Sequence, residues 1–173
     1  MNIVNCDYET HAAPILAILN DAIVSSTALF DYRPRDASSM VEWFRAKDAR
    51  RFPVLGAVAD DGTLLGFATY GAFRAWPAYK YTVEHSVYVH NDHRRQGIAR
   101  ALLTRLIAVA AEQDLHVMVA GIDAANAASI ALHVELGFSY AGTIHQAGFK
   151  FGRWLDLVFY ELRLQTPAAP VDG

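Results

Sequence analysis

The fold is decided by one stretch of the sequence, Val83-Glu84-His85-Ser86-Val87-Tyr88-Val89-His90-Asn91-Asp92-His93-Arg94-Arg95-Gln96-Gly97-Ile98-Ala99-Arg100. Its first half alternates apolar and polar residues, which is typical of a strand. Its second half is a short loop with arginines and a glycine. That loop opens a long amphipathic helix, predicted from about Gly97 to Gln113.

The junction between this strand and this helix predicts an anion site. The first N–H groups of a helix have no intrahelical partner, and the helix dipole favours negative charge there. Gly97 has no Cβ, so the backbone can approach a bound group, and Arg94, Arg95 and Arg100 add positive charge. The spacing is neither the dinucleotide fingerprint nor the P-loop. A structural alternative also stands, in which these residues only form the turn.

The pattern Arg94-x-x-Gly97-x-Ala99 after the strand 86–89 resembles the acetyl-CoA motif of the GNAT superfamily of N-acetyltransferases. The resemblance implies that Val87, Tyr88 and Val89 line the pantetheine arm, beside a bulge that splays the neighbouring strands. It also implies that Arg94 contacts the cofactor and that a loop of six residues holds the pyrophosphate, namely Arg95, Gln96, Gly97, Ile98, Ala99 and Arg100. Many members of the family carry glycine in place of Ala99.

The chain as a whole is expected to form one domain. It has 173 residues, and we predict a domain over residues 1–164 and a disordered tail over 165–173, which is rich in Pro and Ala. The net charge of −3 disfavours nucleic-acid binding. The single Cys6 excludes an intrachain disulfide, and no apolar run approaches a membrane span. We therefore expect a soluble, cytoplasmic protein without a metal cofactor.

The order of predicted elements indicates an α/β fold with a mixed, mostly antiparallel central sheet. Strands are predicted over 3–6, 53–59, 64–70, 81–89, 116–122, 138–144 and 155–164, with residues 148–154 connecting the last two. Asp60-Asp61-Gly62 predicts a hairpin turn. Further helices are predicted to start at the caps Thr10 and Asp36 and to cover 126–136, where Gly137 ends the helix. This order resembles the single-domain GNAT fold, with flanking helices and a sheet splayed at the bulged strand.

Two residues are candidates for proton transfer, because an amine must lose its proton before it attacks a thioester. Glu84 lies on the strand that leads into the loop, and Thr82–Val89 resembles the phosphinothricin and methionine sulfoximine N-acetyltransferases, which implies that Glu84 faces the substrate amine. That subfamily also has His at the position of His133, where many GNAT members have the Tyr that protonates the departing thiolate. Asn126 resembles the family Asn near the thioester, and it can also cap a helix. The alternatives are a solvated strand carboxylate and a half-buried helix histidine.

The substrate side depends mainly on the resemblance. Arg74 can bind a carboxylate through two parallel hydrogen bonds, and Phe30 corresponds to an aromatic wall of the pocket. An exposed loop charge and a core aromatic are the alternatives for these two residues. Because His85 follows Glu84 in a strand, its side chain should point to the opposite face, with only its backbone bordering the site. The remaining expected substrate contacts are Ala75, Trp76, Lys80 and Ser86.

The segment Gly152-Arg153-Trp154 also resembles the subfamily, and there it lies near a dimer interface. We therefore expect a homodimer, and an ion pair between Arg153 and Asp156.

The leading hypothesis is an acetyl-CoA-dependent N-acetyltransferase that acts on the α-amine of a small amino-acid-like molecule. Methionine sulfoximine, methionine sulfone and phosphinothricin are the substrates that the resemblance implies, with direct attack of the amine. Two alternatives stay open: acetylation of a peptide or protein N-terminus or of another amine, and a non-catalytic CoA-binding module.

Overall fold

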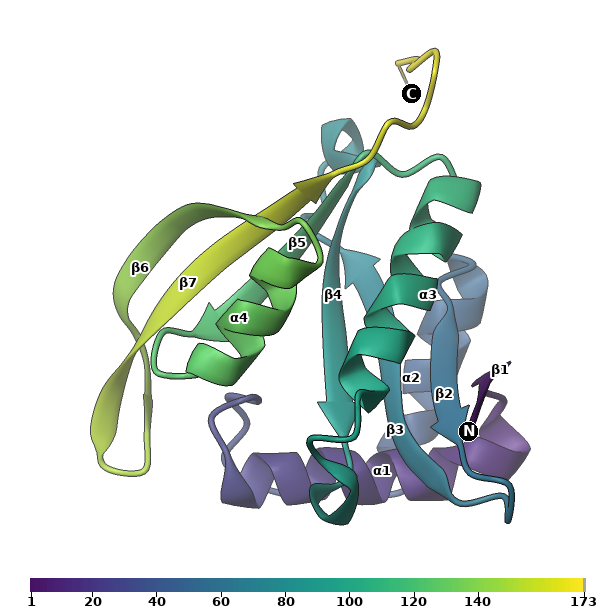
Figure 1. Ribbon diagram of the computed structural model, residues 1–173, viewed down its shortest axis with the longest axis vertical. Helices are drawn as coiled ribbons and strands as arrows, with labels where there is room; N and C mark the ends of the chain where they lie inside the picture. The colour runs from purple at the N-terminus through teal and green to yellow at the C-terminus, as the bar shows by residue number, and fades with distance from the viewer. Residues whose placement is uncertain (173) are drawn as a thin grey trace. The chain divides into compact units, whose positions relative to one another are not determined.

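The computed structural model describes residues 1–172, and these residues form a seven-stranded sheet and four α-helices (Figure 1). The strands are β1 (Asn2–Asn5), β2 (Val54–Val58), β3 (Leu64–Ala72), β4 (Thr82–Val89), β5 (Val117–Asp123), β6 (Ser139–Lys150) and β7 (Arg153–Arg163). The helices are α1 (Tyr8–Ser25), α2 (Ser39–Ala49), α3 (Ile98–Glu112) and α4 (Ala127–Glu135). Two short 3₁₀ helices, η1 (Pro77–Tyr79) and η2 (Asn91–His93), flank β4 in the sequence.

The chain divides into two compact parts, and β3, β4 and α3 each run from one part into the other. The first part comprises Met1–Tyr70 and Ser86–Leu106, and the second comprises Gly71–His85 and the chain from Ile107 onward. The strand order is β1-β2-β3-β4-β5-β7-β6, so β4 belongs to both parts. The predicted mixed, mostly antiparallel sheet is confirmed, since β4 and β5 pair in parallel while β1–β2, β2–β3, β5–β7 and β6–β7 are antiparallel.

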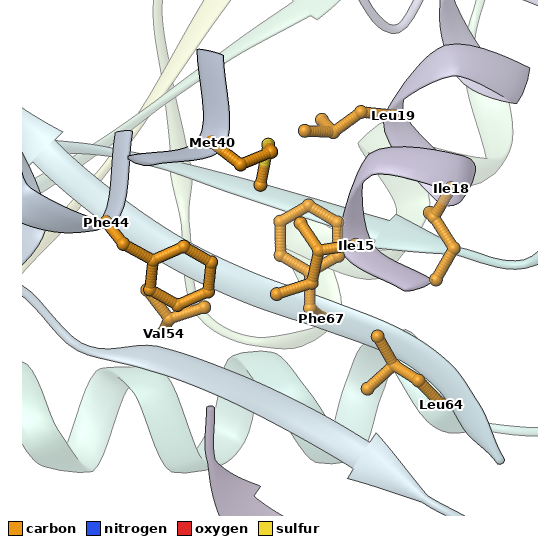
Figure 2. Close-up of a cluster of buried hydrophobic side chains, with 8 residues drawn as sticks. All are labelled: Ile15, Ile18, Leu19, Met40, Phe44, Val54, Leu64 and Phe67. Carbon is orange, nitrogen blue, oxygen red and sulfur yellow. The ribbon is translucent and has the colours of Figure 1, made fainter. Parts of the chain in front are cut away.

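The core of the first part lies between two helices and the hairpin β2–β3. Figure 2 shows side chains of α1 and α2 directed at side chains of these strands, and the cluster comprises Ile15, Ile18, Leu19, Met40, Phe44, Val54, Leu64 and Phe67. Burying each such side chain stabilises the fold by about 1.5–3 kcal/mol. The hairpin turns at the predicted Asp60-Asp61-Gly62, where the Ala59 N–H donates to the Thr63 carbonyl and Gly62 has φ 90°.

Both predicted helix caps were wrong. Helix α1 begins one turn earlier than expected, because the carboxylate of Asp7 accepts the N–H of Thr10 at 2.7 Å and Thr10 itself lies inside the first turn. Helix α2 begins at Ser39, and Asp36 contributes its backbone carbonyl, which accepts from the Ser39 N–H and hydroxyl. In each case an aspartate near the start was the right signal, but hydrogen-bond geometry decided its position and its role.

The second part contains the end of the sheet that carries the long hairpin β6–β7 (Figure 1). Strand β4 pairs with β5 over Thr82–Glu84 and Val117–Val119. Helix α4 packs against β4 through His133, whose ring stacks on that of His85 with centroids 5.0 Å apart. Within β4, Val83 and His85 are buried, whereas Glu84 between them is only half-buried. The alternation of a strand therefore presents Glu84 on the face opposite to α4.

The connection between the last two strands is shorter than predicted. Residues 148–154 were expected to form a loop, but only Phe151 and Gly152 lie between the strands, with φ 52° and 72°. Positive φ at both central residues is the requirement of a two-residue type I′ hairpin. Phe149 and Trp154 form a cross-strand pair with ring centroids 5.1 Å apart, and such aromatic pairs stabilise neighbouring strands.

The ion pair expected between Arg153 and Asp156 was also wrong. Asp156 accepts from the Gln146 N–H at 2.8 Å and lies 3.0 Å from Nδ1 of His145, so it closes contacts across its own hairpin. Arg153 instead lies 3.4 Å from the carboxylate of Asp123, at the end of β5.

Residues 165–172 form neither helix nor strand. Thr166 donates its hydroxyl proton to the Leu115 carbonyl, and the Val171 N–H donates to the hydroxyl of Tyr81. The disorder expected for 165–173 stays a prediction, and Gly173 lies outside the described residues.

Candidate active site

The predicted anion loop forms the entrance to α3 in the first part. The first intrahelical bond runs from the Ala101 N–H to the Gly97 carbonyl, so the amides of Ile98 and Ala99 precede the bonded ladder. Gly97 has φ 78°, and a Cβ built on it would meet no protein atom within 4 Å. Glycine is therefore favoured at position 97 by the backbone conformation and not by a close protein neighbour.

The side chains at the N-terminus of α3 differ in burial. Ile98 is buried and fastens the first turn of α3 to the core, and Ala99 is partly buried. The polar members of the predicted loop are all exposed, namely Arg94, Arg95, Gln96 and Arg100. Exposed guanidinium groups beside free helical amides form a suitable place for a pyrophosphate.

The end of β4 can contact a ligand through its peptide groups and not through its side chains. A Cβ on Gly66 of β3 would lie 2.7 Å from the Tyr88 carbonyl oxygen and 3.1 Å from the Val89 Cα, so glycine allows the two strands to approach here. The ring of Tyr88 packs 5.4 Å from that of Phe67, inside the core of the first part. Tyr88 can therefore contribute its peptide groups to a ligand, but its ring is already used in packing. Val87 and Val89 are likewise partly buried.

Glu84 occupies a recess that β5 leaves open for it. Its carboxylate oxygen Oε1 lies 3.0 Å from the position that a Cβ on Gly121 would take, and Gly121 is exposed. Burial raises the pKa of Glu84 above its ordinary value, and the nearby charge of Arg74 opposes that rise. A carboxylate whose pKa is raised toward neutrality is better suited to accept a proton from an amine than an exposed one.

Arg74 is held by its own loop. Its guanidinium lies 4.2 Å from the centre of the Phe73 ring, and Nη1 donates to the Phe73 carbonyl at 2.8 Å. A guanidinium has five N–H donors, so this bond leaves several for a substrate carboxylate. The following predicted contacts, Ala75, Trp76 and Lys80, are all exposed.

His133 and His85 form a buried pair on the other face of β4. His133 is 1% exposed and His85 is 7% exposed, and their Nε2 atoms lie 3.0 Å apart. Nδ1 of His133 lies 2.7 Å from the Ser129 carbonyl oxygen. Burial lowers the pKa of both rings, that of His85 to about 3, and the hydrogen bond that His133 donates to the Ser129 carbonyl opposes this effect for His133. Both rings are therefore neutral near pH 7.

Asn126 caps α4, as its position in the sequence allowed. Its side-chain oxygen accepts the N–H of Ser129 at 3.1 Å. The NH₂ group of the same amide is a donor that a ligand can use. The capping bond thus holds one end of the amide in place, and the cofactor contact expected for Asn126 stays a prediction.

The structure assembles the predicted residues in distinct groups. In the second part, Arg74 and Glu84 are close enough for their charges to interact, whereas His85 and His133 meet on the opposite face of β4. Phe30 belongs to the first part, where it is 39% exposed in the loop between α1 and α2. Ser86 lies in β4 and is partly buried.

Three residues that shape these groups were not predicted from the sequence. Gly121 makes room for Glu84, and the signal for it was an isolated glycine inside an apolar strand. Phe138 contacts the rings of both histidines, with centroids 5.6 and 5.1 Å away. Asp123 is buried and forms an ion pair with Arg153. No local sequence pattern predicted this pair.

Two features of residues 1–172 bear on the class of protein. They contain no group of three or more His, Cys, Asp or Glu side chains that can hold a metal ion. None of their helices combines the length and the apolar character that crossing a bilayer demands.

Comparison with known proteins gives a consistent result. The model of the acetyltransferase (GNAT) family matches residues 16–138. A curated relative, the L-methionine sulfoximine/L-methionine sulfone acetyltransferase of Pseudomonas paraeruginosa, is 48% identical over 157 residues, which are 90% of this chain and 91% of the relative. A solved structure from Acinetobacter baylyi is 57% identical with a TM-score of 0.98, covering 99% of this chain and 96% of that one. The phosphinothricin acetyltransferase of Sinorhizobium meliloti, solved with acetyl-CoA, is 30% identical with a TM-score of 0.93, covering 98% and 91%.

Proposed function

This chain belongs to the acetyltransferase (GNAT) family and is an N-acetyltransferase, and we propose that it acetylates the α-amine of a small amino-acid-like substrate. The proposed substrates are methionine sulfoximine and methionine sulfone, with phosphinothricin as a further candidate, and the acetyl donor is acetyl-CoA. The relatives that carry these substrates in their names match 90% and 98% of this chain.

One observation carries the proposal: the half-buried carboxylate of Glu84 faces the exposed Gly121 of β5, within range of the charge of an arginine. Burial raises the pKa of Glu84, and the charge of Arg74 opposes that rise. An α-amino acid presents an ammonium and a carboxylate one carbon apart. A base and an arginine in the same region match these two groups.

The residues of the first part fit acetyl-CoA. The start of α3 offers amides and exposed arginines to a pyrophosphate, and the end of β4 offers peptide groups to the pantetheine arm. Bound acetyl-CoA would supply the thioester that the amine attacks. The contacts proposed for it in the first part are Val87, Tyr88, Val89, Arg94, Arg95, Gln96, Gly97, Ile98, Ala99 and Arg100. Asn126, which belongs to the second part, is proposed as a contact by its resemblance to the family Asn.

In the proposed mechanism each side chain has one task. Arg74 binds the substrate carboxylate and so orients the amine. Glu84 removes a proton from the ammonium, directly or through a water molecule, because an ammonium has no lone pair with which to attack. The pair formed by His133 and His85 returns a proton to the departing thiolate. Holding both reactants in line contributes a large part of the rate.

The test is release of free thiol from acetyl-CoA in the presence of a panel of amines. Saturable turnover on methionine sulfoximine, methionine sulfone or phosphinothricin is expected, with little on common amino acids, a short peptide or an aminoglycoside. Turnover on the peptide alone would replace the proposal with modification of protein N-termini. Binding of acetyl-CoA with no turnover on any amine would replace it with a non-catalytic module.

Glu84→Gln tests the base. We expect kcat to fall by roughly 10²–10⁴-fold, as removal of a general base does, while the Kd for acetyl-CoA stays within about twofold. Unchanged turnover would exclude Glu84 as the base. Glu161→Gln, which changes another strand carboxylate of the second part, is the matched control and should leave kcat unchanged.

Arg74→Ala tests the carboxylate contact through the choice of substrate. KM should rise for methionine sulfone but not for the corresponding amine without a carboxylate. An equal rise for both would show that Arg74 does not bind the carboxylate.

We further propose that the protein is a cytoplasmic homodimer that contacts its partner through the hairpin β6–β7. Large apolar side chains are exposed on this hairpin, namely Tyr140, Ile144, Phe149, Phe151 and Trp154. Exposed apolar patches of this kind mark association surfaces. Light scattering after gel filtration should give twice the chain mass, and Trp154→Ser should reduce it. Trp76→Ser, at an even more exposed tryptophan, is the control that should stay dimeric.

A further inference from the structure

The buried histidine pair has a defined arrangement of protons. The Ser129 carbonyl can only accept a hydrogen bond, so Nδ1 of His133, 2.7 Å away, carries a proton. In the neutral ring Nε2 of His133 is then an acceptor. Its neighbour at 3.0 Å is Nε2 of His85, which must therefore be the donor.

This arrangement leaves both nitrogens of His133 occupied and opens one nitrogen of His85. With its proton on Nε2, His85 has an acceptor at Nδ1. That atom is buried and has no hydrogen-bond partner among residues 1–172. A ligand that exchanges a proton with this pair therefore meets His85, and reaches His133 only through it.

The surroundings favour charge on His133 rather than on His85. His133 lies in the last turn of α4, where the helix dipole stabilises a cation, and Nδ1 already donates to a carbonyl. His85 is itself buried and packs against the ring of Phe138, and the carboxylate of Glu84 lies on the opposite face of β4. A proton that arrives at His85 is thus passed on to His133.

We propose that His85 and His133 act as one proton-transfer pair, in which Nδ1 of His85 meets the reactants and His133 holds the charge. This proposal deepens the proposed acetyl transfer and rests on it. When the attacking nitrogen gives up its second proton, the N–H bond breaks and a bond to Nδ1 of His85 forms. The Nε2–H bond of His85 breaks at the same time, and its proton binds Nε2 of His133. The reverse shift delivers a proton from Nδ1 to the departing sulfur, so no proton is gained or lost overall.

Nitrogen-15 NMR of the histidine rings tests the pair without requiring turnover. The chain has seven histidines, and His85→Gln and His133→Gln assign the two signals of interest. We expect the protonated nitrogen to be Nε2 in His85 and Nδ1 in His133. Saturating CoA together with methionine sulfone should shift Nδ1 of His85 toward the hydrogen-bonded range. The opposite tautomers, or an Nδ1 signal that no combination of CoA, acetyl-CoA and amine moves, would overturn the proposal.

A kinetic cycle tests whether the two rings act together. His85→Gln places an amide NH₂ near Nε2 of the original ring, so the bond to His133 can persist, but an amide cannot relay a proton. We expect kcat to fall by roughly 10²-fold in His85→Gln, in His133→Gln and in the double variant alike, with the KM for acetyl-CoA unchanged. Losses that multiply in the double variant, or a kcat of His85→Gln near that of the wild type, would overturn the proposal.

Two further variants guard against a purely structural effect. Phe138→Leu disturbs the packing of both rings without removing either, so it should lower kcat much less than His85→Gln does. A loss as large as that of His85→Gln would assign the histidines a packing role. If His85→Gln does not fold, His85→Asn replaces it in the cycle. An absence of turnover on every amine, with the expected NMR result, would reject the proposed substrate class while leaving the pair intact.

Discussion

Replacing Gly121 by alanine should impair catalysis while leaving the fold as stable as before. The new Cβ would lie 3.0 Å from Oε1 of Glu84, whereas ordinary contacts begin at about 3.4 Å, so the carboxylate must retreat by about 0.4 Å. Because a misplacement of about 1 Å costs on the order of 10²-fold in rate, this shift predicts a loss of roughly five- to tenfold in kcat.

The free energy of unfolding of this variant should rise slightly or stay unchanged. The atom nearest to the new Cβ is the end of a flexible side chain, and the next neighbour is a ring carbon of Phe159 at 3.5 Å, an ordinary contact. Gly121 does not have the positive φ that would strain an alanine. Reduced freedom of the unfolded chain then stabilises the variant by about 0.4–1 kcal/mol.

The assay combines thiol release from acetyl-CoA with urea unfolding, and a double-mutant cycle with Glu84→Gln identifies the cause. If Gly121→Ala acts by displacing the carboxylate, it should have no further effect once that carboxylate is gone. The same five- to tenfold loss in the Glu84→Gln background would refute the reasoning. So would an unchanged kcat in the single variant.

Three other changes have expected outcomes. Arg74→Gln removes the charge that opposes the rise in the Glu84 pKa, so the acidic limb of the pH profile of kcat/KM should move to higher pH. High salt screens the same charge and should move the limb of the wild-type protein in the same direction. A limb that does not move would contradict the electrostatic coupling between Arg74 and Glu84. Because the pKa of His85 is lowered to about 3, the unfolded chain binds a proton there between pH about 6.5 and about 3 that the folded chain does not. The free energy of unfolding should therefore fall by up to about 1.4 kcal/mol per pH unit as the pH is lowered through this range, and His85→Phe should flatten the slope measured by urea unfolding at several pH values. Gly66→Ala would bring a Cβ to 2.7 Å from the carbonyl oxygen of Tyr88, a backbone atom, so unfolding should become easier by about 1–3 kcal/mol and acetyl-CoA affinity should drop; an unchanged unfolding midpoint would disprove this close approach.

Those parts of the fold that depend on local signals were predictable from the sequence. The turn at Asp60-Asp61-Gly62 and the strand that carries Glu84 both formed where the pattern placed them. The strands of the last hairpin were predicted too short because Gly148 and Gly152 were both interpreted as turn residues. Only Gly152 lies in the turn, with φ 72°, whereas Gly148 pairs with Leu155 inside the sheet.

The candidate site was predictable to the extent that its residues follow a pattern along the chain. Glu84 and the loop before α3 belong to one continuous stretch, so their chemistry was visible in the sequence. The partners that decide their behaviour come from elsewhere. His133 lies 48 positions beyond His85, and Arg153 lies 30 positions beyond Asp123, and no periodicity links residues so far apart. Contacts of this kind arise from the packing of β4, β5 and α4, which only the folded chain specifies.

Strand β4 shows how one element can serve two proton transfers without mixing them. Successive side chains of a strand point to opposite faces, so Glu84 and His85 are neighbours in the chain yet face different surroundings. Glu84 is half-buried, which raises its pKa, and the charge of Arg74 opposes that rise, whereas His85 is buried next to a second histidine, which lowers its pKa and keeps it neutral. Acetyl transfer to an amine needs a group that takes a proton from an ammonium and a group that brings one to a thiolate. Two successive residues of β4 are therefore sufficient to supply both groups, and a one-residue slip in the register of this strand would exchange their surroundings and abolish both roles.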